Sequence, residues 1–174
     1  MNYIVLAGIA LLISQLSLAE NHEAAKTKTI IGHEISDEGK RMDITAGNLT
    51  AVELFKSYVE AHNQRDTSAI ERLNASDFKA WAANGVVIDG SEAHITFLKD
   101  WFTSANPNWK YKYAIANDVV QPDGSVNHWV TSAYTVTNTV DGKSVKVEEM
   151  YDARVENGKI KFLFVADRAV FSEE

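Results

Sequence analysis

Residues 109–170 decide the fold, and they read WKYKYAIANDVVQPDGSVNHWVTSAYTVTNTVDGKSVKVEEMYDARVENGKIKFLFVADRAV. Apolar and polar residues alternate over four long runs, and a glycine stands in each of the three interruptions. Alternating runs joined by glycine-containing turns are typical of hairpins, so we expect a meander of antiparallel strands. The predicted strands cover residues 109–120, 126–140, 145–155 and 160 to about 170.

The residues before this stretch predict mainly helices. Thr50 and Glu53 match a capping box, and the apolar residues after them recur at helical spacing to about Asn63. A shorter helix over 66–73 and a hairpin at Asn84–Gly85 come next. A last helix is expected from Gly90–Ser91 to Asn106, where Pro107 stops it.

This order of elements predicts an α+β fold. We expect about three N-terminal helices to pack on one face of a curved antiparallel sheet. That sheet would consist of four long strands plus the short hairpin.

The N-terminus carries the pattern of an export signal. Residues 4–13 are an uninterrupted apolar run, too short to span a bilayer, and Ser17 and Ala19 provide small residues before a cleavage site. We expect a signal peptide over 1–19, cleaved after Ala19, a flexible arm over 20–48 and one domain over 49–174. Within the arm, Ile30, Ile31 and Ile35 could add a short strand. An uncleaved anchor is the alternative. The mature protein would be periplasmic or secreted, without stable insertion in a membrane.

Composition excludes several classes of function. The net charge is -7 and no basic stripe is present, which argues against nucleic acid and anionic membranes as partners. The chain has no cysteine and its five histidines are dispersed, so we expect no metal site. No phosphate-binding loop, dinucleotide fingerprint or nucleophile elbow occurs, and no cofactor is expected.

The pattern over residues 48–170 resembles the nuclear-transport-factor-2-like superfamily, close to its SnoaL-like branch. The residues that carry the resemblance are VELF at 52–55, HNQRD at 62–66, Ala69–Ile70, Asp77–Phe78, and Gly90, Ala93 and Phe97–Leu98 of the last helix. The resemblance implies a cone with a pocket, and in many members a homodimer formed through the sheet. Members include ketosteroid isomerase, scytalone dehydratase, limonene epoxide hydrolase, polyketide cyclases and non-enzymatic binding proteins, so the fold does not choose the activity.

Alternation along the strands predicts which side chains line the pocket. The covered face of the third strand carries Val145, Val147, Glu149, Tyr151, Ala153 and Val155. The same rule groups Val126, His128, Val130, Ser132, Tyr134 and Val136 on the second strand. It groups Trp109, Tyr111, Tyr113 and Ile115 on the first strand, and Ile160, Phe162, Phe164 and Ala166 on the fourth, where Leu163 and Val165 make the assignment ambiguous.

Three residues are candidates for acid–base chemistry. Glu149 is the only charged residue on its covered face, so burial would raise its pKa and suit it to proton transfer. His128 is the second candidate, with a hydrogen-bonded core histidine as the alternative. Asp89 lies just before the last helix, loosely resembling the region of the isomerase base. It departs from that pattern because Gly90–Ser91 begin the helix at once, without an intervening loop, and the helix dipole alone would stabilise an aspartate there.

These residues support two hypotheses of function. In the first, an exported domain binds a small, largely apolar molecule in the cone without catalysis. In the second, the same pocket belongs to a cofactor-independent isomerase, dehydratase or cyclase that uses acid–base chemistry. The expected ligand contacts are Trp81, Tyr111, Tyr113, Ser132, Tyr134, Tyr151 and His62.

A flat, weakly polar strip is expected on the opposite face of the second strand. Its members are Trp129, Thr131, Ala133, Thr135 and Thr137. Such a strip suits sheet-to-sheet pairing, so we expect a homodimer formed through this face.

Overall fold

The computed structural model describes residues 28–170 and contains three helices and eight strands within that range. The helices are α1 (Leu49–Asn63), α2 (Thr67–Leu73) and α3 (Ser91–Ala105). The strands are β1 (Ile30–Ile35), β2 (Arg41–Ala46), β3 (Asn74–Trp81), β4 (Val87–Asp89), β5 (Asn108–Val120), β6 (Val126–Val140), β7 (Lys143–Glu156) and β8 (Lys159–Ala169).

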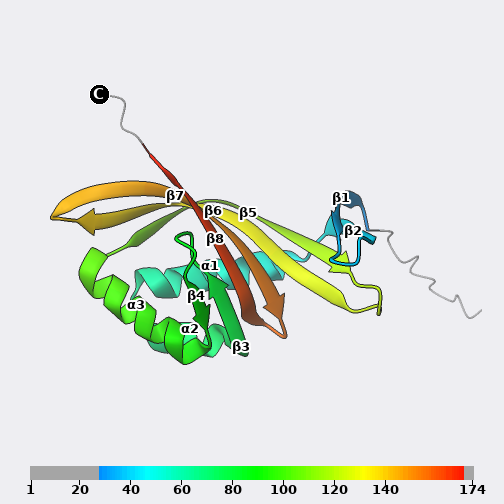
Figure 1. Ribbon diagram of the computed structural model, residues 1–174, viewed down its shortest axis with the longest axis horizontal. Coiled ribbons are helices and arrows are strands. Elements are labelled where there is room, and N and C mark those ends of the chain that lie inside the picture. Colours follow the sequence, from blue (N-terminus) through cyan, green and yellow to red (C-terminus); the bar gives the residue numbers. More distant parts are fainter. Residues whose placement is uncertain (1–27, 171–174) are drawn as a thin grey trace, which may run out of the picture.

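All eight strands form one curved, open sheet in the order β1-β2-β5-β6-β7-β8-β3-β4. Neighbouring strands in the sheet pair antiparallel, except that β3 and β8 pair parallel to each other. The three helices lie on one face of the sheet (Figure 1). This arrangement confirms the expected α+β fold, whereas the expectation of four long strands plus a hairpin misses two strands near the N-terminus and the pairing of β3.

The two additional strands come from the segment that we expected to be a flexible arm. Residues 30–46 form the β1–β2 hairpin, which extends the sheet beyond the helices (Figure 1). The chain then passes so close to β5 that a Cβ on Gly47 would lie 2.7 Å from the backbone nitrogen of Asn117. The expected signal peptide over 1–19 lies outside the described residues. Within 28–170, no helix is both long enough and apolar enough to cross a membrane.

The turns and caps mostly follow local sequence. Asp141–Gly142 and Asn157–Gly158 have positive φ at both positions, which two-residue hairpins require, and both dipeptides join antiparallel strands as expected. The N-cap of α1 differs from the expectation. Asn48 caps the helix by accepting a hydrogen bond from the Thr50 backbone nitrogen at 2.9 Å, because the helix begins one residue before Thr50.

The core fills the space between the helices and the inner face of the sheet. Phe55 and Tyr58 of α1 and Leu98 of α3 are almost fully buried there. They meet an inner face on which Glu149, Tyr151, Ala153 and Val155 of β7 are buried as expected, whereas Val145, which was also expected to be covered, is exposed. Burial of these faces is the main stabilising term of a domain without disulfides.

A β-bulge in β5 changes the face on which part of that strand lies. Tyr111 pairs with Tyr134, but Tyr113 pairs with Ala133, so Lys112 is an extra residue. The expected grouping of Tyr113 and Ile115 with Trp109 is therefore wrong. Both lie on the outer face and are exposed, because one inserted residue reverses the alternation.

A second bulge, at Lys161, reverses the alternation of inner and outer side chains in β8. Val155 pairs with Ile160 and Arg154 with Phe162, which leaves Lys161 unpaired in the register. Phe162 and Phe164 therefore lie on the outer face, contrary to the expected grouping, and Leu163 is buried in the core. The correction has the same cause as in β5.

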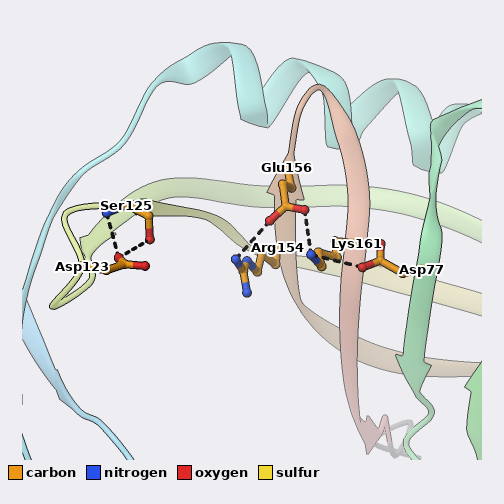
Figure 2. Close-up of polar contacts among 6 residues, drawn as sticks. All are labelled: Asp77, Asp123, Ser125, Arg154, Glu156 and Lys161. Carbon is orange, nitrogen blue, oxygen red and sulfur yellow. Dashed lines mark hydrogen bonds and ion pairs between the residues drawn. The ribbon is translucent and has the colours of Figure 1, made fainter.

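Ion pairs hold the β8 bulge between its neighbours (Figure 2). The Lys161 ammonium lies 2.7 Å from Glu156 of β7 and 3.2 Å from Asp77 of β3. Arg154 donates to the same Glu156 carboxylate at 3.2 Å. Lys161 thus links the three strands at the place where the sheet changes from antiparallel to parallel pairing.

Deletion of Lys161 tests how the bulge works. Without it, simple alternation still places Ile160, Leu163 and Val165 on the inner face, so we expect a folded protein. Loss of its partly exposed ion pairs should lower the melting temperature, followed by circular dichroism, by roughly 5 °C or less. Deletion of Thr135, which has regular partners on both sides, is the control and should unfold the domain. An equal loss of thermal stability in both deletion variants would contradict the conclusion that Lys161 is an extra residue in the register of β8.

Candidate functional site

A cavity of about 490 Å³ opens between the helices and the inner face of the sheet. Its walls come from α1, α3, the β3–β4 hairpin, β7 and β8, and they are mainly aromatic and aliphatic. The volume lies within the range of small-molecule sites, roughly 300–1,000 Å³. The polar groups on these walls fall into two sets, one on the sheet and one on the helices.

The sheet contributes a carboxyl group in a chain of hydrogen bonds. Glu149 is 7% exposed and accepts a short hydrogen bond from the Tyr151 hydroxyl. The indole nitrogen of Trp109 donates to that hydroxyl at 2.6 Å. Burial raises the pKa of Glu149, the hydrogen bonds from Tyr151 and Trp109 oppose the rise, and the charge of Asp167 adds to it. This environment favours the protonated form of the carboxyl more than water does.

Asp167 belongs to the same set and was missed by the sequence analysis. It pairs directly with Glu149 across β7 and β8 and lines the exposed mouth of the cavity. The Lys161 bulge places it there, because regular alternation from Ile160 would have turned it outward. Apolar Leu163 and Val165, two residues apart, were the available signal for the reversed face.

His62 of α1 is the first polar group on the helical wall. It is 6% exposed, and its Nδ1 donates to the Tyr58 carbonyl at 2.7 Å. Burial lowers the pKa of His62 to about 4, the hydrogen bond to Tyr58 opposes this, and the charge of Arg65 lowers it further. The ring is therefore neutral near pH 7, and because Nδ1 carries the hydrogen, Nε2 is an acceptor.

His94 of α3 is the second polar group on the helical wall, and the sequence analysis did not predict it. Its Nδ1 accepts from the amide nitrogen of Asn74 at 3.2 Å, while the amide oxygen accepts from Tyr58 at 2.9 Å. Burial lowers the pKa of His94 to about 3, and the nearby His62 adds to the effect. The neutral ring then carries its hydrogen on Nε2. Its helical spacing with Leu98 and Trp101 was the available signal.

The structure brings together only part of the expected site. Glu149, Tyr151 and His62 line the cavity. His128 lies elsewhere, where it contacts Asp118 at 2.7 Å with about half of its side chain exposed. Asp89 is also outside the cavity and forms an exposed ion pair with Lys79 at 2.9 Å.

The remaining expected ligand contacts lie on other surfaces. Trp81 stacks on Phe164 of the outer face, with ring centroids 4.4 Å apart. Tyr111 and Tyr134 line a separate open groove beside α1, and Ser132 is buried. The Tyr134 and Ser132 hydroxyls have no hydrogen-bond partner among the described residues. Tyr113 lies on the outer face of the sheet, where it pairs with Ala133. The pairing of two chains through this outer face stays a prediction.

The open sheet with three helices and a cavity on one face is the arrangement of the nuclear-transport-factor-2-like superfamily. A family model described as SnoaL-like polyketide cyclase matches residues 52–162, and the chain belongs to this family. No curated protein matches the chain at a significant level. In residues 28–170, no group of three or more acidic, histidine or cysteine side chains is placed to hold a metal ion.

Solved structures share the fold at low sequence identity. A candidate polyketide cyclase from Xanthomonas campestris pv. campestris is 21% identical, with a TM-score of 0.56 over 67% of this chain and 88% of that one. An LEH-like epoxide hydrolase from M. tuberculosis is 15% identical, with a TM-score of 0.57 over 68% and 82%. A candidate ketosteroid isomerase from Kribbella flavida is 12% identical, with a TM-score of 0.54 over 70% and 80%.

The two buried histidines predict loss of stability in mild acid. Each has a lower pKa in the folded protein than its ordinary value of 6.5, so the unfolded chain binds more protons below that pH. Between pH 7 and pH 5 we expect the free energy of unfolding to fall by roughly 2 kcal/mol per histidine. His62→Asn keeps a donor for the Tyr58 carbonyl but does not titrate, and should remove about half of the loss.

Urea unfolding at both pH values measures this effect. The raised pKa of Glu149 acts in the opposite direction, since its contribution falls as pH rises, but it is common to wild type and variant. His33→Asn, at an exposed position of β1, is the matched control and should change nothing. An unchanged pH dependence in His62→Asn would show that this ring is protonated in the folded protein.

Proposed function

We propose that this domain binds a small, largely apolar molecule in the cavity. The observation that carries the proposal is the size of the cavity together with its lining, in which aromatic and aliphatic walls surround a few convergent polar groups. Hydrogen bonds from other protein side chains hold these polar groups in place: Tyr151 donates to Glu149, and Asn74 donates to His94. Such preorganised groups orient a ligand without first having to break internal contacts. Export of the domain is a further proposal, which rests on residues 1–19 alone.

Filling the cavity should abolish binding. Val165 lines it near the mouth, so Val165→Trp places an indole in the space that the ligand would occupy. We expect prodan, a neutral apolar fluorophore, to bind the wild type with a blue-shifted emission, and Val165→Trp to weaken this binding at least about tenfold. Ala166→Trp adds the same side chain on the outer face of β8 and is the control. Equal binding by both variants would place the probe elsewhere.

Acid–base catalysis in the same cavity is a second candidate function. It is favoured by one observation, a buried carboxyl with a raised pKa that lines the same cavity as two neutral imidazoles. Glu149 would take a proton from carbon next to a carbonyl group, and the Nε2 hydrogen of His94 would stabilise the developing oxyanion.

Proton exchange in D₂O separates the two functions. If Glu149 is a general base, the protein should accelerate exchange of α-protons in a panel of cyclic ketones, followed by NMR. Glu149→Gln should slow this exchange by about 100-fold or more. His128→Asn, at a histidine outside the cavity, should leave the rate unchanged. Absence of exchange in the wild type over the whole panel would leave binding as the function.

A further inference from the structure

The charged groups on the cavity wall are all of one sign. Asp100 of α3, Glu149 of β7 and Asp167 of β8 line it, but no lysine or arginine does. The two histidines on the wall are neutral near pH 7 because burial lowers their pKa values. The walls therefore present negative charge, with no positive side chain to balance it.

The two carboxyls on the sheet are in an unfavourable arrangement on their own. Glu149 and Asp167 are directly opposite each other on β7 and β8, on the same face. Like charges at opposed positions destabilise a sheet, and a buried carboxylate needs a partner of opposite charge. Neither carboxylate forms an ion pair with another described residue. In the empty protein a proton can relieve this repulsion, and a bound cation would relieve it with a new contact.

The aromatic walls suit an organic cation. Trp101 and Trp109 stand nearly perpendicular with centroids 5.2 Å apart, and Phe97 lies 5.8 Å from Trp101. Ring faces attract ammonium groups, and the attraction is larger where water is excluded. The same rings provide apolar surface for the remainder of a ligand.

His62 adds an acceptor that has no partner. Its Nδ1 is occupied by the Tyr58 carbonyl, and its Nε2 forms no hydrogen bond with the described residues. The side chain is more than nine-tenths buried and lines the cavity, 5.5 Å from Trp109 between ring centroids. A lone pair in this position accepts from an N–H or O–H group of a ligand, and repels a carboxylate.

We infer that the preferred ligand is a protonated amine on an apolar body, with its ammonium group bound by Glu149 and Asp167 and its body against the aromatic walls. This inference rests on the proposed binding function and adds the charge of the ligand. It also gives the opposed carboxyls a role, because the ligand supplies the positive charge that the walls lack. The orientation follows, with the ammonium group near the sheet.

Three naphthalene compounds of one skeleton test the charge. They are 2-naphthylmethylamine, which is cationic at pH 7.5, the neutral 2-naphthylmethanol and the anionic 2-naphthoate. With the purified protein in calorimetric titrations, we expect the amine to bind at least about tenfold more tightly than the alcohol, and the naphthoate most weakly. Asp167→Asn, at the exposed mouth, should reduce the ratio of the affinity for the amine to the affinity for the alcohol severalfold, through weaker binding of the amine. Glu149→Gln should reduce it further.

Asp152→Asn is the matched control, because Asp152 lies on the outer face of β7 and bonds to Thr131. It should leave all three affinities unchanged. Equal affinities of the wild type for amine and alcohol would overturn the inference while leaving the proposed apolar binding intact. An advantage of the amine that survives both Asp167→Asn and Glu149→Gln would overturn the assignment to these carboxyls. Failure of all three compounds and of prodan to bind would overturn the proposed function itself.

Discussion

The choice of which side chains of β8 face the helices is the constraint on which the rest of the structure depends. Side chains of a strand alternate strictly between faces, so one extra residue decides which half of β8 meets the core. Here it turns Leu163, Val165 and Asp167 toward the helices and leaves Phe162 and Phe164 outside. Without that reversal the cavity would have neither the second carboxyl nor the small side chains that leave it open. Ion pairs from Lys161 to Glu156 and Asp77 hold the extra residue in place (Figure 2).

A layer of buried polar groups under the helices sets the electrostatics of the site. Asn74, at the start of β3, accepts from Tyr58 and donates to both His94 and Ser91. These bonds fix the tautomer of His94, just as the Tyr58 carbonyl fixes that of His62. Removing such groups from water is costly, and the hydrogen bonds offset this cost only while the rings are neutral. The result is a cavity in which the two buried histidines of the helical wall are neutral, while Glu149 and Asp167 stand on the sheet wall.

The sequence predicts the fold well where local patterns agree with tertiary structure. In β7 the alternation is regular, so Glu149 and Tyr151 were placed on the correct face from residues alone. The prediction of faces from alternation fails in β5 and β8, because Tyr113 and Phe162 come after a bulge in each strand. His128 lies on a strand with the expected period, but the helices do not reach that end of the sheet, and Asp118 binds it there. Asp167 and His94 were missed because their roles depend on which distant elements face them.

The parallel pairing of β3 with β8 has a consequence for the order in which the domain can assemble. The elements β4, α3 and β5–β7 separate these strands in sequence, and among the strands of residues 28–170 only β3 joins the β3–β4 hairpin to the rest of the sheet. Ribosomes make the chain from its N-terminus, so residues 74–89 are made before β8 and wait for it. One wall of the cavity therefore closes only after β8 has been made. Until then the aromatic side chains of α1 and α3 have no sheet to cover them on that side, and a chain shortened before residue 159 would never acquire one.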